Sequence, residues 1–232
     1  MLKKIWYWTK RIFIVAFITS FIYLLLCKWF LPPITFTQIG SIIDGYGLKK
    51  DYVGWEDISP NVKLAAIAAE DQLFPDHNGF DWKSIQKSLD ADPGKTKRAA
   101  GSASSTISQQ TAKNVFLWQG DDLTRYIRKV PEFYFAQLTE WIWGKKRILE
   151  VYLNVIEMGK GIFGIEAAAQ QYFHKTAANL TRSEAAQIIA CLPNPKVYTV
   201  KPQSRYITNR TQWILRQMHN LEGDPDIKEL LK

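Results

Sequence analysis

The sequence is poor in cysteine and histidine. It contains two cysteines, Cys27 and Cys191, and three histidines among 232 residues. Two cysteines are too few for a disulfide framework or a structural zinc site. His77, His174 and His219 lie too far apart to form a pair of metal ligands on one helix. Hydrophobic residues make up 47% and charged residues 22% of the chain, which excludes disordered and low-complexity proteins and leaves one globular domain with an appendage.

Acidic residues are absent from the chain before Asp44. An uncharged apolar run covers residues 12–27, which is short of the ~20 residues that span hydrocarbon. The span is complete if Lys28 snorkels and the apolar residues through Leu31 continue it. The basic residues before the run are Lys3, Lys4, Lys10 and Arg11. The pattern predicts a transmembrane anchor over residues 12–31.

A cleaved signal peptide is the alternative interpretation of this N-terminus. Its apolar core is normally shorter, and no convincing small-x-small cleavage site precedes Pro32-Pro33. We therefore expect a single-pass anchor that is retained. The positive-inside rule predicts that residues 1–11 are cytoplasmic and that the rest of the chain lies outside.

The remainder of the chain reads as a connector followed by a helical domain. Residues 32–58 hold Pro32-Pro33, a Gly-containing turn signal after Asp44 and little periodicity, so we interpret them as an extended connector. From Ser59, a plausible N-cap before Pro60, apolar residues recur at helical spacing, and strand-like alternation is scarce. The sequence predicts a mainly α domain over residues 59–225.

The net charge of +8 and the pI near 9.3 indicate an acidic partner, such as nucleic acid, an anionic membrane or a phosphate-bearing substrate. Residues 159–164 match the GxGxxG pattern, but a dinucleotide site needs a buried strand before it. A helical pattern precedes these glycines, so we expect a tight turn between two helices instead.

Two carboxylates stand out in the sequence. Glu70 ends an Ala-rich helical segment, and Glu132 shares a predicted helix face with Arg125 and Arg128. A solvated surface position for Glu70 and a salt-bridged solvent face for Glu132 are the alternatives. The cations Lys113, Arg125, Arg128 and Lys129 can together neutralise a diphosphate. Two carboxylates beside a basic cluster suit glycosyl transfer from a diphosphate-linked sugar.

Four ordered segments resemble the motifs of peptidoglycan glycosyltransferases. Residues 70–81 resemble EDxxFxxHxGxD, residues 105–114 resemble STITQQLxKN, and residues 128–132 match RKxxE. Residues 145–175 match KxxILExYLNxxxxGxGxxGxxxAAxxYFxK at every fixed position. The resemblance covers about residues 55–200 and includes the GxGxxG. The length of the chain leads us to expect the monofunctional biosynthetic type, without a transpeptidase domain.

This resemblance implies a lysozyme-like, two-lobed helical fold and an enzyme of the inner (plasma) membrane with a periplasmic catalytic domain. The substrates would be lipid II and a growing glycan strand, joined by a β-1,4 link with inversion and loss of undecaprenyl diphosphate. Membrane lipids and proteins of cell-wall synthesis or division would be further partners, and nucleic acid would not. A lysozyme-like hydrolase or lytic transglycosylase and a non-catalytic anion-binding membrane protein remain the alternatives.

The resemblance also implies roles for single residues. Glu70 would be the general base, and Glu132 would organise the donor diphosphate, directly or through a divalent ion such as Mg²⁺ or Mn²⁺; no cofactor is required for certain. By analogy with inverting glycosidases, the two carboxylates should lie roughly 6.5–9.5 Å apart. Lys113 and Arg128 would be the principal phosphate ligands. Further substrate-binding positions are Lys129, Arg125, Ser105, Thr106, Gln109, Gln110 and Asn114.

Some motif residues are expected to support the site rather than bind substrate. Asp71 and His77 would brace the first motif, and we assign Glu150, Tyr152 and Asn154 to the scaffold. Many relatives carry an arginine four residues before the RK pair, where this chain has Thr124. Arg125, one position later, is the candidate replacement.

Overall fold

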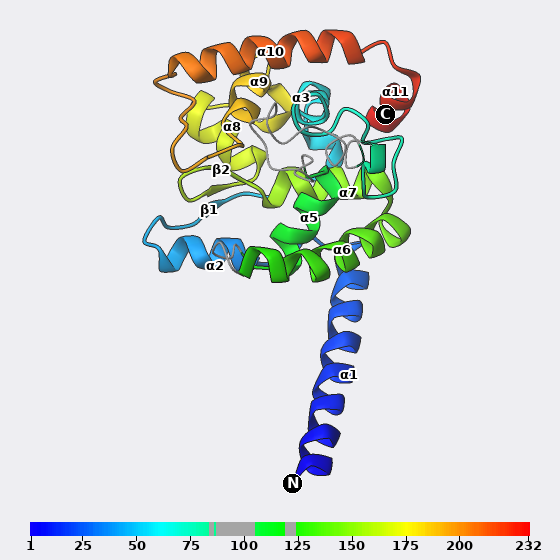
Figure 1. Ribbon diagram of the computed structural model, residues 1–232. Helices are drawn as coiled ribbons and strands as arrows, with labels where there is room; N and C mark the ends of the chain where they lie inside the picture. Colours follow the sequence, from blue (N-terminus) through cyan, green and yellow to red (C-terminus); the bar gives the residue numbers. More distant parts are fainter. Residues whose placement is uncertain (84–85, 87–104, 119–123) are drawn as a thin grey trace, which may run out of the picture. The chain divides into compact units, whose positions relative to one another are not determined.

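The computed structural model describes residues 1–83, 86, 105–118 and 124–232 (Figure 1). The chain forms two compact units, Met1–Pro32 and Pro33–Lys232. The first unit consists mainly of helix α1 (Leu2–Cys27). Its segment Lys3–Cys27 has a mean hydropathy of 2.0 and is long and apolar enough to cross a membrane. The helix starts earlier than the predicted span, because Lys and Arg are good helix formers, and it ends at Cys27 rather than at residue 31.

The segment predicted to be an extended connector is folded into the second unit. It contains helix α2 (Phe36–Ile43), strand β1 (Lys49–Lys50) and the 3₁₀ helix η1 (Trp55–Asp57). Thr35 starts α2 through a capping box with Gln38. The polar face of α2 is buried (Thr37, Gln38, Ser41), and its apolar side chains are exposed (Phe36, Ile39, Ile42, Ile43). Phe36, Ile39 and Ile43 recur at helical spacing, so the sequence does carry the signal of this helix, and the interpretation of the segment as an extended connector is wrong.

The predicted mainly α fold is confirmed. The second unit contains α3 (Pro60–Glu70), α5 (Ile107–Phe116), α6 (Thr124–Ile142), α7 (Gly144–Val155), α8 (Ile165–Phe173), η2 (Ala177–Asn179), α9 (Arg182–Ala190), α10 (Arg205–Leu221) and α11 (Pro225–Leu231). The predicted N-cap is confirmed: the Ser59 side chain accepts from the Asn61 N–H at the start of α3. At the start of α9, Thr181 forms a capping box with Glu184.

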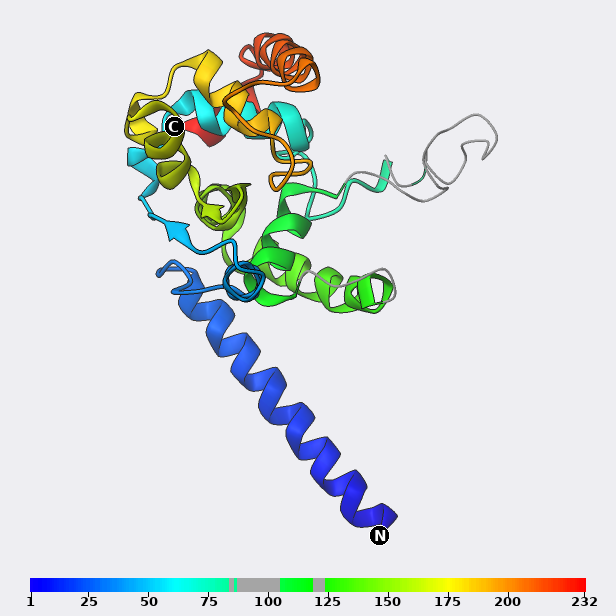
Figure 2. The ribbon, with the colours of Figure 1, turned by 90° about the vertical axis from the view of Figure 1, so that its left-hand side faces the viewer.

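Helix α3 packs against α9 and α10, and α5 packs against α6 and α7. In both ribbon views α10 lies beside α9 and α3, and it crosses α3 rather than running along it (Figures 1 and 2). Ala65, Ala66 and Ile67 of α3 and Ile148 and Leu149 of α7 are fully buried. This packing fixes the end of α3 and the start of α5, where the candidate site lies.

A small sheet joins α7 to α8. Strand β3 (Ile162–Phe163) pairs in parallel with β1 and antiparallel with β2 (Glu157–Gly159). The GxGxxG segment is therefore a β-hairpin, and the predicted turn between two helices is wrong in this respect. Gly164 has a φ of +86°, and a Cβ there would lie 2.6 Å from the Asn154 carbonyl oxygen. At this position the glycine serves a close backbone approach.

Candidate active site

Glu70 occupies the last position of α3 and is half-buried in the second unit. Its Oε2 accepts a hydrogen bond of 2.8 Å from the Gln110 amide. Burial raises the pKa of Glu70 above its usual value, and the Gln110 bond and the charges of Arg210 and Lys113 oppose that rise. A carboxylate with a raised pKa beside a hydrogen-bond donor can accept a proton near neutral pH.

Gln110 is held from three sides. Its Nε2 donates to Glu70 and, at 3.3 Å, to the Ser105 carbonyl, while the Tyr152 hydroxyl donates to its Oε1 at 3.3 Å. The amide therefore presents a donor, and not its carbonyl, to Glu70. Tyr152, which we assigned to the scaffold, is therefore connected to the Glu70 carboxylate through Gln110. The sequence analysis missed this connection because Gln110 and Tyr152 stand on different helices.

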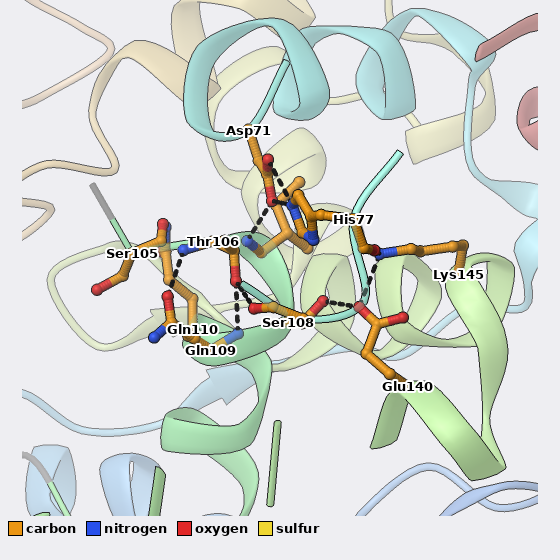
Figure 3. A network of polar contacts seen from close by, with 11 residues as sticks. Asp71, His77, Ser105, Thr106, Ser108, Gln109, Gln110, Glu140 and Lys145 are labelled. Atoms are coloured by element: carbon orange, nitrogen blue, oxygen red, sulfur yellow. Dashed lines mark hydrogen bonds and ion pairs between the residues drawn. The ribbon is translucent and has the colours of Figure 1, made fainter. Parts of the chain in front are cut away.

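Asp71 braces the start of α5, as expected (Figure 3). Its carboxylate oxygens lie 3.0 Å from His77 Nε2, and its Oδ2 accepts from the Ile107 N–H at 2.9 Å. Thr106 caps α5: its hydroxyl accepts from the Gln109 N–H and donates to the Gly79 carbonyl. The Gln109 side chain accepts from the Thr106 N–H. Thr106 and Gln109 thus have structural partners, and their role in the donor groove stays a prediction.

Glu132 lies on α6 and is buried. Its Oε1 is 2.6 Å from Lys129 Nζ and its Oε2 is 3.7 Å from Arg128 Nε. The Arg128 guanidinium also donates to the Trp118 carbonyl at 2.8 Å. Glu132 is 2% exposed and Arg128 is 5% exposed, so the alternative of a solvent face is wrong. The cations are held in place by a buried carboxylate.

Lys113 connects the two carboxylates electrostatically. Burial lowers its pKa; Glu132 and Glu70 raise that pKa, and Arg128 and Lys129 lower it further. The Lys113 ammonium is therefore within electrostatic reach of both carboxylates and of two other cations. The Arg125 side chain lies outside the described residues. The separation of roughly 6.5–9.5 Å between the carboxylates also stays a prediction.

A cavity of about 320 Å³ opens beside Gln110 and Lys113. Its other wall comes from the segments after α7 and α9, with polar groups from Glu157, Asn194 and Lys196. Burial raises the pKa of Glu157, whose Oε1 accepts from the Gly161 N–H at 3.1 Å. The cavity lining is Gln110, Lys113, Asn114, Ile156, Glu157, Leu192, Pro193, Asn194, Pro195 and Lys196. The sequence analysis missed the second wall because nothing local in the sequence places it opposite α5.

The described residues do not fit a resident divalent ion at Glu132. Among them, no group of three or more His, Cys, Asp or Glu side chains is placed to hold a metal. The Glu132 oxygens face Arg128 and Lys129, which already supply positive charge there. We therefore derive no step that runs through a metal ion. Both cysteines are free.

Nearly the whole chain is similar to known transglycosylases. The Transglycosylase family profile matches residues 37–219. The chain is 45% identical over 236 aligned residues to a "Biosynthetic peptidoglycan transglycosylase" of Yersinia pseudotuberculosis serotype O:3 (strain YPIII), covering 98% of this chain and 95% of the relative. A protein of the same name from Yersinia pestis (strain Pestoides F) is 45% identical over 235 residues, with the same coverage. The matched segment includes Glu70, Gln110, Lys113 and Glu132. The chain belongs to the transglycosylase family.

Proposed function

We propose that this protein is a peptidoglycan glycosyltransferase that polymerises lipid II into β-1,4 glycan strands. The observation that carries the proposal is the half-buried Glu70, hydrogen-bonded to Gln110 and within electrostatic reach of Lys113. A proton acceptor and a cationic cluster are the two elements that glycosyl transfer from a lipid diphosphate requires. Membership of the transglycosylase family supports the same activity.

In the proposed reaction Glu70 removes the proton from the 4-hydroxyl of the acceptor sugar. The acceptor oxygen then forms a bond to the anomeric carbon of the donor, and the bond from that carbon to the diphosphate oxygen breaks. Attack from the face opposite to the leaving group inverts the anomeric centre. Undecaprenyl diphosphate leaves with its electron pair, and Glu70 later returns its proton to solvent.

The cations supply the other half of the mechanism. Lys113, Arg128 and Lys129 neutralise the charge that develops on the departing diphosphate. Glu132 holds Arg128 and Lys129 by ion pairs of 3.7 and 2.6 Å, so its proposed role is to position these cations. Ser105 and Asn114 extend the polar surface: the Ser105 hydroxyl lies 3.4 Å from Lys129 Nζ, and Asn114 lines the cavity.

We further propose that α1 anchors the protein in the inner membrane, with residues 1–11 cytoplasmic and the catalytic domain outside. The length and hydropathy of α1 and the basic residues at its start support this orientation. The exposed apolar side chains of α2, which follows shortly in the sequence, suit a domain that works at a lipid surface. A lipid-linked substrate is presented at such a surface.

A hydrolase or lytic transglycosylase is the other enzymatic candidate, and it leaves Lys113 and the Arg128–Lys129 pair without a role. Incubation of the detergent-solubilised full chain with labelled lipid II separates the two. The proposal predicts long glycan strands and no cleavage of preformed strands. Shortening of preformed strands without polymerisation would contradict the proposal. Salt-sensitive binding of lipid II without product would favour a non-catalytic anion-binding protein.

A further inference from the structure

Arg210 reaches the end of α3 from outside the four sequence motifs. It lies on α10, which packs against α3. Its Nη2 donates to the carbonyl oxygen of Ala69, the residue before Glu70, at 3.1 Å. Its guanidinium carbon lies 4.2 Å from the centroid of the Trp213 ring, which holds the side chain over α10. The guanidinium is therefore fixed by two contacts.

The C-terminal end of a helix carries unpaired carbonyl groups and a partial negative charge. A guanidinium bound to one of the last carbonyls of α3 satisfies that group and places a full positive charge beside the last residue of the helix. That last residue is Glu70. Burial raises the pKa of Glu70, and three groups lower it. The hydrogen bond from Gln110 has the largest lowering effect, followed by the charge of Arg210 and then by that of Lys113.

Several groups face Glu70 from the elements packed around it. Gln110 and Lys113 come from α5, Asp71 follows α3, Tyr152 comes from α7 and Arg210 comes from α10. In the proposed reaction the positive charge of Lys113 is engaged by the donor diphosphate. Arg210 instead donates to the Ala69 carbonyl at the end of α3, and this bond holds its charge beside Glu70.

We infer that Arg210 is a positioning residue for the general base: it fixes the backbone before Glu70 and keeps that carboxylate ionised. The inference rests on the proposed function, because it requires Glu70 to accept the proton of the acceptor hydroxyl. It adds a second requirement to the site, namely a cation held at the end of α3 by the Ala69 carbonyl.

The test is the pH dependence of lipid II polymerisation by the full chain. Rates of Arg210→Gln are divided by wild-type rates at each pH, which cancels the titration of the substrate. Removal of the Arg210 charge raises the pKa of Glu70 further. The acid limb of the profile, where the rate rises with pH as Glu70 becomes ionised, therefore moves to higher pH. If the limb moves by about one pH unit, the rate on it falls about tenfold, and the loss disappears on the alkaline plateau.

Two further variants separate charge from structure. Arg210→Lys keeps the charge, so its acid limb stays near that of the wild type even if the plateau is lower. Arg216→Gln removes an exposed charge from the same helix and leaves the profile unmoved. If Arg210→Gln fails to fold, Arg210→Met, which keeps an aliphatic stem against Trp213, is measured in the same way.

A neutral variant whose acid limb coincides with that of the wild type overturns the inference, whatever its plateau rate. An equal movement of the limb in Arg210→Lys overturns it as well, because charge would then not be the cause. Either result leaves the proposed function standing if Glu70→Gln is inactive. Polymerisation by Glu70→Gln would instead remove the proposed role of Glu70, on which the inference depends.

Discussion

Replacement of Gln110 by leucine removes the amide that donates to Glu70 and keeps a side chain of similar size. The lost bond is 2.8 Å long and has the half-buried carboxylate of Glu70 as its acceptor. A hydrogen bond to a charged group contributes about 1.5–3 kcal/mol, and each 1.36 kcal/mol is a tenfold change in rate. We therefore expect Gln110→Leu to lower kcat/KM by about 10- to 150-fold on the acid side of the profile.

The sign of the pH dependence follows from the direction of the pKa. Burial already raises the pKa of Glu70, and the Gln110 bond opposes that rise. Without this bond the pKa rises further, so the base is ionised only at higher pH. The loss of activity should be greatest at low pH and should shrink as the pH increases.

The assay is the initial rate of lipid II polymerisation across pH. Gln109→Leu is the matched control, because the Gln109 side chain accepts from the Thr106 N–H at the start of α5. This control should lose some stability without any movement of the acid limb. A loss for Gln110→Leu that is equal at every pH, or no loss at all, would refute the reasoning.

Two further predictions concern stability. Asp71→Ala leaves His77 Nε2 and the Ile107 N–H without an acceptor, so it should lower the free energy of unfolding by about 2–5 kcal/mol. The measurement is urea unfolding in detergent. A change within about 0.5 kcal/mol, as for a surface substitution, would contradict this prediction. Gly164→Ala should lower the same free energy by about 1–3 kcal/mol, because its φ is +86° and the new Cβ would meet the Asn154 carbonyl. Gly40→Ala is its control: Gly40 lies inside α2 with open space around it, so the change should be neutral or stabilising, and an equal loss in both variants would contradict the argument.

Most of the helices were predictable because their signals are local. Ser59 and Pro60 at the start of α3 and the Thr181–Glu184 capping box act through neighbours a few residues away in the chain. The apolar residues of α2 also recur at helical spacing, but its exposed face is apolar and its buried face is polar, so the face that packs inward was not predictable. Burial of an apolar face is the assumption behind periodicity arguments, and α2 does not follow it.

The site was predictable where motif residues meet each other, and less so where other segments join them. Glu70 and Gln110 come from the first two motifs, and their hydrogen bond connects two predicted site residues. Arg210 lies beyond all four motifs and reaches Ala69 through the packing of α10 on α3. Asn194 reaches the cavity in a similar way, from the segment after α9. No local pattern encodes such approaches, because they arise from tertiary packing.

The role of Glu70 as general base is the central claim, and one comparison tests it most directly. Wild-type protein and Glu70→Gln, both full-length and in the same detergent, are incubated with labelled lipid II at a pH on the alkaline plateau. The substitution keeps the shape of the side chain and removes its capacity to accept the proton. We expect glycan strands from the wild type and none from the variant, with similar thermal unfolding of the two proteins. Polymerisation by Glu70→Gln at the wild-type rate would contradict the account.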